Sequence, residues 1–264
     1  MDAQRDRSMI EIAKRRADSG CFYIDTEDLQ QNVLFALCQD EILGFDASRN
    51  EYFISHDIYE EWALNKIVNR SWRKIGEVQA FFSAIGDSLP IRRAFRMWLS
   101  DELMESDGDI PQIIHYAFKD STFPIFWKDE IIVACLLSNH ADRFFSLFDK
   151  EFKANNFAIF RRALSLLRIA CVVPNKLFQQ MMVPCGKGWE DAIHFMYRYR
   201  NETFDKNIAI ALPVLRDWTS ANPSGQATKE VGVMVFSVIE NADVSGAHCF
   251  TNLAKDLINI SLKS

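Results

Sequence analysis

Glycine and proline are scarce in this sequence of 264 residues, which contains 10 glycines and 7 prolines. All-β sandwiches and barrels use both residues in many tight turns, so their scarcity argues against those folds and favours helices. Long apolar runs are also lacking. The run from Ile131 to Leu137 has only seven residues, whereas a membrane-spanning helix needs about 20. We therefore expect a mainly α protein that does not enter a membrane.

A surplus of basic residues is missing as well. The chain has 30 Lys and Arg against 36 Asp and Glu, a net charge of −6. Such a chain repels nucleic-acid phosphates unless it carries a local basic patch, so we expect no nucleic-acid partner. None of the six cysteines forms a Cys-x-x-Cys pair, and residues 1–19 are too charged for a secretory signal. These features predict free thiols and a cytoplasmic location.

Signatures of catalysis are lacking too. No phosphate-binding loop of the form Gly-x-x-x-x-Gly-Lys-Ser/Thr occurs, and the nearest segment, Cys185 to Gly188, lacks its first glycine and the hydroxyl after Lys187. We interpret that segment as a loop between two helices. The histidines do not have the spacing of a zinc site. We therefore expect no catalytic residue, no metal ligand and no cofactor in this chain, and no enzyme activity of the chain by itself.

Residues 1–75 are predicted to form a small domain that combines helices with a short sheet. A helix from about residue 7 to 18 ends at Gly20, and a second helix begins at Asp25 or Thr26. Strands are predicted at 22–24, 42–45 and 52–54, the last two joined by a polar turn. The order helix, strand, helix, β-hairpin is that of a winged-helix domain.

Residues 76–264 contain almost only helical patterns. The predicted helices cover 77–86, 90–105, 110–119, 124–138, 141–153, 157–172, 189–200, 205–219, 226–241 and 249–262. The spacing of Phe144, Phe145, Phe148 and Phe152 predicts a core stripe on one helix. Helix pairs joined by short loops predict a solenoid-like array of helical hairpins, although no repeat of fixed length is present. We expect any sheet to be confined to the first domain.

The segment that joins the two regions is the most informative part of the chain. It reads Tyr52-Phe-Ile-Ser-His-Asp-Ile-Tyr-Glu-Glu-Trp-Ala63, a strand that runs into a helix. Asp57, with Ser55 as the alternative, is the predicted cap of that helix, and Glu60 follows Asp57 at capping-box spacing. The helix N-terminus, with its free N–H groups, is electropositive, and the ring nitrogens of His56 add hydrogen-bond donors there.

This segment resembles the end of the winged-helix domain in the STAND-class signalling ATPases, the NACHT and NB-ARC proteins. In that family a strand runs into a His-Asp pair, the MHD motif, and Ser55 stands here in place of its Met. The resemblance is most specific to large bacterial proteins such as the Avs-type antiphage sensors. It covers about residues 7–70. The ATP-binding core of the family has no counterpart in this sequence, because the phosphate-binding loop is missing.

The resemblance implies a role for His56. In the family the winged helix folds over the nucleotide in the inactive state, and the histidine donates a hydrogen bond to the β-phosphate of ADP. His56 would make this contact in a parent protein that binds ADP or ATP, and Asp57 and Ser55 would cap the helix and fix the turn that carries His56. The alternative is that Ser55 or Asp57 only caps a helix and His56 is an ordinary surface residue.

The sequence leaves more than one class of function open. The first is a regulatory and protein-interaction module of a STAND-like ATPase in antiviral defence or signalling. Its partners would be the nucleotide-binding core of the same or another chain and a protein ligand of the helical array. The alternative is a winged-helix DNA-binding regulator with a helical effector or dimerisation domain. Against it, residues 1–75 hold 10 basic and 14 acidic residues, and residues 27–38 hold no Lys or Arg.

Overall fold

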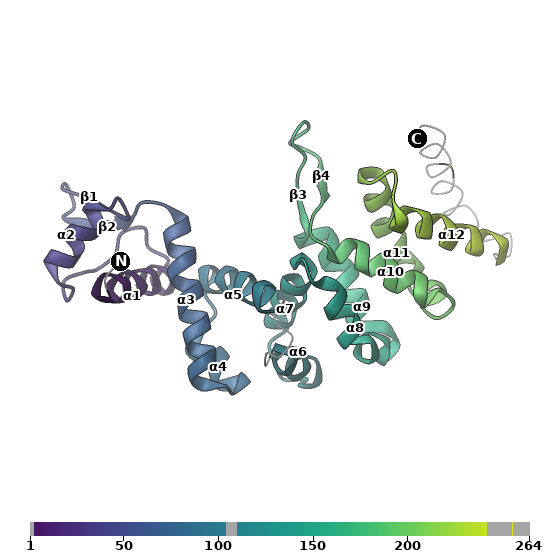
Figure 1. Cartoon of the computed structure of the whole chain (residues 1–264), viewed down its shortest axis with the longest axis horizontal. Coiled ribbons are helices and arrows are strands. Elements are labelled where there is room, and N and C mark those ends of the chain that lie inside the picture. The colour runs from purple at the N-terminus through teal and green to yellow at the C-terminus, as the bar shows by residue number, and fades with distance from the viewer. Residues whose placement is uncertain (1–2, 104–109, 242–254, 256–264) are drawn as a thin grey trace. The chain divides into compact units, whose positions relative to one another are not determined.

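The computed structural model describes residues 3–103, 110–241 and 255 (Figure 1). The described residues form twelve helices and four short strands, so the predicted mainly α class is confirmed. They divide into two compact units, Met1–Leu99 and Ser100–Ser264. The first unit extends further along the chain than the predicted small domain of residues 1–75, because two more helices join it. The predicted helix at 249–262 lies outside the described residues, except for Lys255.

The first unit consists of a small two-stranded sheet with helices before and after its strands. Its elements are α1 (Ala3–Ser19), α2 (Gln31–Gln39), β1 (Leu43–Asp46), β2 (Glu51–Ile54), α3 (Asp57–Ile75), α4 (Val78–Ile85) and α5 (Leu89–Glu102), whose last turn passes the unit's end. The strands β1 and β2 form an antiparallel hairpin, and Ile24 forms a bridge with Tyr52 of β2. Helix α1 packs against α2 and α3, and α3 packs against α4.

The second helix begins later than the sequence predicted. The carboxylate of Asp25 accepts the N–H of Glu27 at 3.1 Å, and the N–H of Leu29 bonds the carbonyl of Thr26. These bonds form a turn rather than a helix, so α2 starts only at Gln31, and neither Asp25 nor Thr26 caps it. Asp is favoured both at helix N-caps and in tight turns, so the residue type alone could not distinguish a cap from a turn at Asp25.

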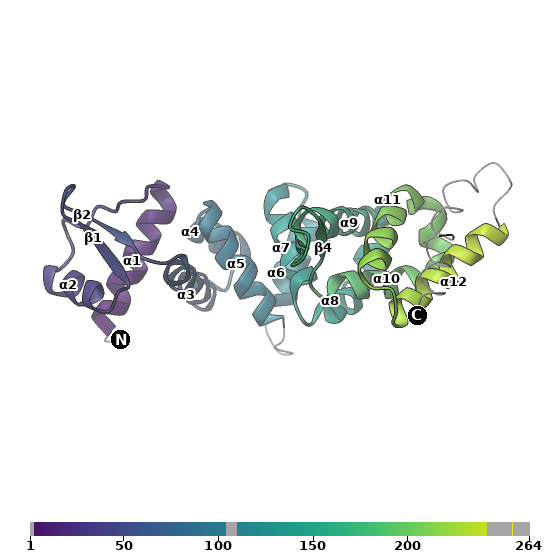
Figure 2. The same cartoon turned by 90° about the horizontal axis from the view of Figure 1, so that it is seen from above.

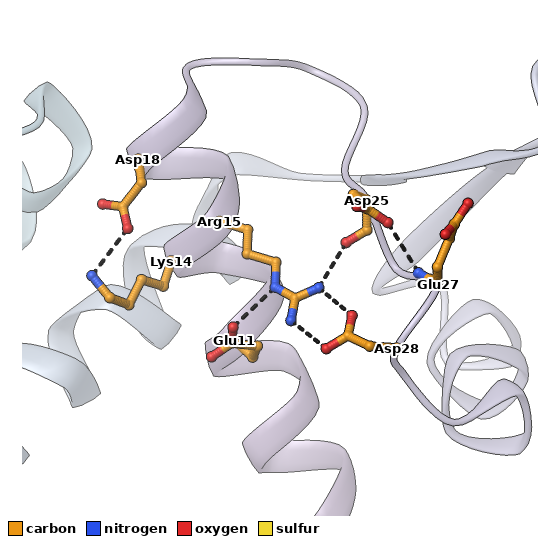
Figure 3. A network of polar contacts seen from close by, with 7 residues as sticks. All are labelled: Glu11, Lys14, Arg15, Asp18, Asp25, Glu27 and Asp28. Carbon is orange, nitrogen blue, oxygen red and sulfur yellow. Dashed lines mark hydrogen bonds and ion pairs between the residues drawn. The ribbon is translucent and has the colours of Figure 1, made fainter.

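Arg15 on α1 holds this turn in place (Figure 3). Its guanidinium binds both carboxylate oxygens of Asp28, at 2.6 and 2.7 Å, and also reaches Glu11 at 2.9 Å and the carbonyl of Asp25 at 3.0 Å. The bond from Arg15 lowers the pKa of the Asp28 carboxyl. A bidentate pair adds direction as well as energy, so Arg15 fixes the path of the chain between α1 and α2.

Gly44 makes room for an aromatic cluster on the hairpin. A Cβ at Gly44 would lie 2.2 Å from the ring of Phe53, its cross-strand partner. With no side chain at Gly44, the Phe53 ring covers the backbone there and stacks on Phe22 with ring centroids 5.0 Å apart. Tyr23 meets the same ring edge-on at 6.1 Å, and its hydroxyl donates to Asp46 at 2.8 Å. The cluster attaches the segment after α1 to the sheet.

The second unit is an array of helices with one more hairpin. Its elements are α6 (Ile110–Lys119), α7 (Ile125–Leu137), α8 (Ala141–Leu147), α9 (Asp149–Ala170), β3 (Val172–Pro174), β4 (Met182–Pro184), α10 (Gly188–Arg198), α11 (Arg200–Ala221) and α12 (Gln226–Asn241). Helix α9 is two helical segments separated by a break over Ala154–Phe157. Helix α7 packs on α9 and α9 on α11, while α8 packs on α10 and α10 on α12. Within this unit, Figure 2 shows the two alternating rows that result.

The four phenylalanines that the sequence predicted to be core are buried in the second unit, but they do not lie on one helix, because α8 ends at Leu147 and α9 begins at Asp149. Phe144, Phe145, Phe148 and Phe152 are all buried. Phe145 stacks on Phe152 at 5.1 Å, and the buried Phe195 of α10 lies 5.5 Å from Phe152. The stripe therefore joins α8 and α9 to α10.

The hairpin of β3 and β4 is a correction to the sequence analysis, which expected sheet only in the first domain. The two strands pair antiparallel, with Val173 opposite Val183. Each strand has three residues. Runs this short carry no alternation of apolar and polar residues long enough to be read as strands. The hairpin extends away from the helices of its own unit (Figure 1).

Candidate functional site

His56 lies at the junction of β2 and α3. The backbone of His56 is extended, with φ −140° and ψ 136°, and it is the N-cap residue of α3, which begins at Asp57. The His56 side chain is exposed and makes no cap hydrogen bond. Its nearest aromatic contact is Tyr59, with ring centroids 6.0 Å apart. The imidazole therefore stands at the positive end of a 19-residue helix, on the surface of the first unit.

The structure assigns other roles to Ser55 and Asp57 than the predicted caps. The Ser55 hydroxyl donates to the carbonyl of Ile42 at 3.0 Å and to that of Glu41, so it ties the end of β2 to the start of β1. Asp57 is the first residue inside α3 rather than its cap. A carboxylate there still interacts favourably with the positive end of the helix dipole, but it does not accept hydrogen bonds from the free backbone N–H groups as an N-cap side chain would. The prediction that these two residues cap the helix was wrong, since the N-cap is His56.

A cavity of about 310 Å³ opens beside this junction, within the first unit. Three helices bound it: the end of α1 with the segment that follows, the first turns of α3, and the first turn of α5. Its wall combines two cations, three carboxylates and apolar groups. The residues that matter most are Arg16, Phe22, Asp57, Glu60, Glu61 and Arg93. His56 is not among the lining residues.

Arg16 and Glu60 form an incompletely paired contact in that wall. The Nη1 atom of Arg16 lies 3.5 Å from Oε2 of Glu60, and Nη2 lies 3.5 Å from Oδ1 of Asp57. Both distances are long for a charged hydrogen bond. Glu60 is only 8% exposed, and its Oε1 atom has no hydrogen-bond partner among the described residues. Burial therefore raises the pKa of the Glu60 carboxyl, and Arg16 opposes the rise.

These charges decide what the cavity can hold. Three carboxylates against two arginines leave no surplus of positive charge in the wall, so it is not a phosphate pocket. Within the wall, Arg16 of α1 lies at ion-pair distance from Asp57 and Glu60 in the first turn of α3, next to His56. Sequence reasoning missed Arg16, Phe22 and Arg93, because no motif connects them. Only the packing of three helices brings them together.

The remaining predicted features lie apart from this junction. Cys185–Gly188 connects β4 to the first residue of α10 and is not a loop between two helices, and the Nζ atom of the N-cap residue Lys187 lies 3.6 Å from Oε2 of Glu190. Among the described residues, no group of three His, Cys, Asp or Glu side chains could hold a metal ion. Within the same part of the chain, no helix is both long and apolar enough to cross a membrane. No model of a known protein family and no curated protein matches the sequence.

Proposed function

We propose that this chain is the regulatory and protein-interaction module of a STAND-like signalling ATPase, and that His56 contacts the nucleotide held by the ATP-binding core. The observation that carries the proposal is the position of His56. It follows the second strand of the hairpin directly, stands at the N-terminus of a long helix and leaves its side chain exposed. A helix N-terminus with a histidine beside it is suited to an anionic phosphate.

The element order of the first unit supports the winged-helix part of the proposal. Helix α1, the bridge residue Ile24, helix α2 and the hairpin β1–β2 follow one another as in a winged helix. The alternating rows of helices in the second unit support the solenoid-like array. In this proposal the array binds a protein ligand, and the chain acts in the cytoplasm in antiviral defence or signalling.

The lack of basic residues on α2 argues against the alternative of a DNA-binding regulator. In a winged-helix regulator this helix would enter the major groove, where it needs cations for phosphates. Helix α2 has no basic residue, and Val33, Leu34 and Leu37 on it are buried. We expect no salt-dependent, sub-micromolar gel shift with duplex DNA at physiological salt.

The bound nucleotide tests the proposal. The protein or complex that contains this chain is purified from its host cells, and bound ADP is measured after heat release by chromatography. We expect ADP in the wild-type preparation, less in His56→Ala, and none with the purified chain alone. His140→Ala is the matched control, since His140 is the N-cap of α8 and also makes no cap bond. Equal ADP in the His56→Ala and His140→Ala preparations would contradict the proposal.

A further inference from the structure

The tip of the second hairpin, residues 175–181, exposes apolar side chains at an unusual density. Leu177 is 86% exposed and Phe178 63% exposed. Met181, Met182 and Val173 of the same hairpin are also exposed. Single exposed apolar residues are normal on a protein surface, but five exposed ones on a single hairpin make it a candidate interaction site.

Hydrogen bonds within the tip present these side chains in a fixed arrangement. The Asn175 side-chain oxygen accepts the N–H groups of Leu177 and Phe178, at 2.8 and 3.1 Å. The N–H of Asn175 donates to the carbonyl of Met181 at 2.7 Å, and the N–H of Met181 donates to that of Phe178. An Asx turn closed in this way needs little ordering when a partner binds.

The base of the hairpin is fixed as firmly as its tip. The carbonyl of Cys171 accepts both the indole N–H of the buried Trp189, at 2.7 Å, and the N–H of Cys185, at 2.9 Å. Gly188, the first residue of α10 after the hairpin, lies so close to the backbone of Leu136 on α7 that a Cβ atom would not fit. The helices therefore hold the hairpin at a set position on their own unit, from which it projects (Figure 1).

We infer that this tip inserts into an apolar groove of a protein partner, and that the groove is bordered by carboxylates. Lys176 is the only charged residue between Cys171 and Gly186. It precedes Leu177 and Phe178, the two most exposed apolar side chains of the hairpin, so carboxylates at the border of a groove that buries them would complement its ammonium group. The inference rests on the proposed function, because it names the surface by which the helical array binds its protein ligand.

Two other occupants fit the hairpin less well. An anionic membrane attracts clusters of basic residues, whereas the hairpin has one lysine and the chain has a net charge of −6. A second copy that added its own strand would need free N–H groups along an edge. Pro174 in β3 and Pro184 in β4 have none to offer. Recognition is therefore by the side chains of the tip.

Site-specific cross-linking in the host cell identifies the partner. A photoreactive amino acid replaces Gln179, which lies in the tip, in the full chain, and the same amino acid at Lys150 on α9 serves as the control. The partner found by mass spectrometry is then purified, and its affinity for the full chain is measured. Phe178→Asp should weaken binding about 30-fold or more, as expected for a central apolar anchor. Leu147→Asp, at a single exposed leucine of α8, should leave the affinity unchanged.

Lys176 supplies the second arm of the test. Lys176→Glu should weaken binding about tenfold at low salt, and Lys176→Arg should retain it. Several results would overturn the inference: no product specific to position 179, a cross-link only to a second copy, or equal affinities of the wild-type protein and Phe178→Asp. Binding to vesicles of three parts phosphatidylcholine to one part phosphatidylserine that Phe178→Asp abolishes would assign the tip to membranes instead. None of these measurements involves ADP, so their failure would be distinguishable from a failure of the proposed contact between His56 and ADP.

Discussion

Gly188, at the start of α10, should not tolerate even one added methyl group. A Cβ there would lie 2.6 Å from the carbonyl oxygen of Leu136 and 2.7 Å from its Cα. Both atoms belong to the backbone of the buried helix α7, so no side-chain rotation can relieve the overlap. Overpacking of a core costs about 1–3 kcal/mol, and the gain from alanine's helix propensity is at most about 1 kcal/mol. We therefore expect Gly188→Ala to lower the free energy of unfolding by about 2 kcal/mol.

Gly232 provides the matched control. It also lies inside a helix of the second unit, α12, but a Cβ there would meet no described residue within 4 Å. Only helix propensity changes at this position, so Gly232→Ala should raise the free energy of unfolding by about 0.5–1 kcal/mol. Urea denaturation of the full chain, followed by circular dichroism and by tryptophan fluorescence, to which the buried Trp189 contributes, gives the stability of both variants. A Gly188→Ala protein as stable as the wild type would refute the close packing of α10 on α7.

Two carboxylates should give stability opposite dependences on pH. Asp6 binds Lys66 at 2.6 Å and Arg70 at 2.8 Å, and its pKa is lowered, chiefly by the hydrogen bond from Lys66. Its contribution is therefore present above about pH 4 and is lost as the pH falls. Asp6→Asn should cost about 1 kcal/mol at pH 7 and reduce the loss of stability in acid. For Asp191, burial first and then the charge of Asp142 raise the pKa to about 6. The folded protein then keeps a proton that the unfolded chain loses, so stability falls as the pH rises from about 4 to 6. Asp191→Asn should remove this fall and be about 1 kcal/mol more stable at pH 7. Urea titrations between pH 3 and 8 test both, and slopes unchanged by the substitutions would contradict the assigned causes.

The helices were predictable where apolar periodicity and punctuation agree. The predicted ranges 110–119 and 226–241 coincide with α6 and α12. At Gly20, with φ 67°, the left-handed backbone that only glycine adopts easily explains why α1 ends there. Local rules of this kind need no knowledge of the rest of the fold.

The features that escaped prediction depend on contacts distant in sequence. The strands β3 and β4 are too short to show a pattern, and the contact at their base joins Cys171 to Trp189, 18 residues further along the chain. The cavity needs Arg16, Glu60 and Arg93 from three helices. At the His56 junction, the motif correctly indicated a strand followed by a helix. It did not indicate the cap, because the Ser55 hydroxyl donates instead to the carbonyls of Glu41 and Ile42, just before β1.

The central claim is that His56 holds ADP in the inactive state of a larger switch. The most direct measurement is the rate at which a fluorescent ADP analogue leaves the P-loop-bearing protein or complex that contains this chain. One hydrogen bond to a charged phosphate is worth about 1.5–3 kcal/mol, so His56→Ala should release the analogue about ten to a hundred times faster. His140→Ala should leave the rate unchanged. Equal release from the wild-type and His56→Ala proteins would contradict the claim and leave His56 a surface residue at a helix end.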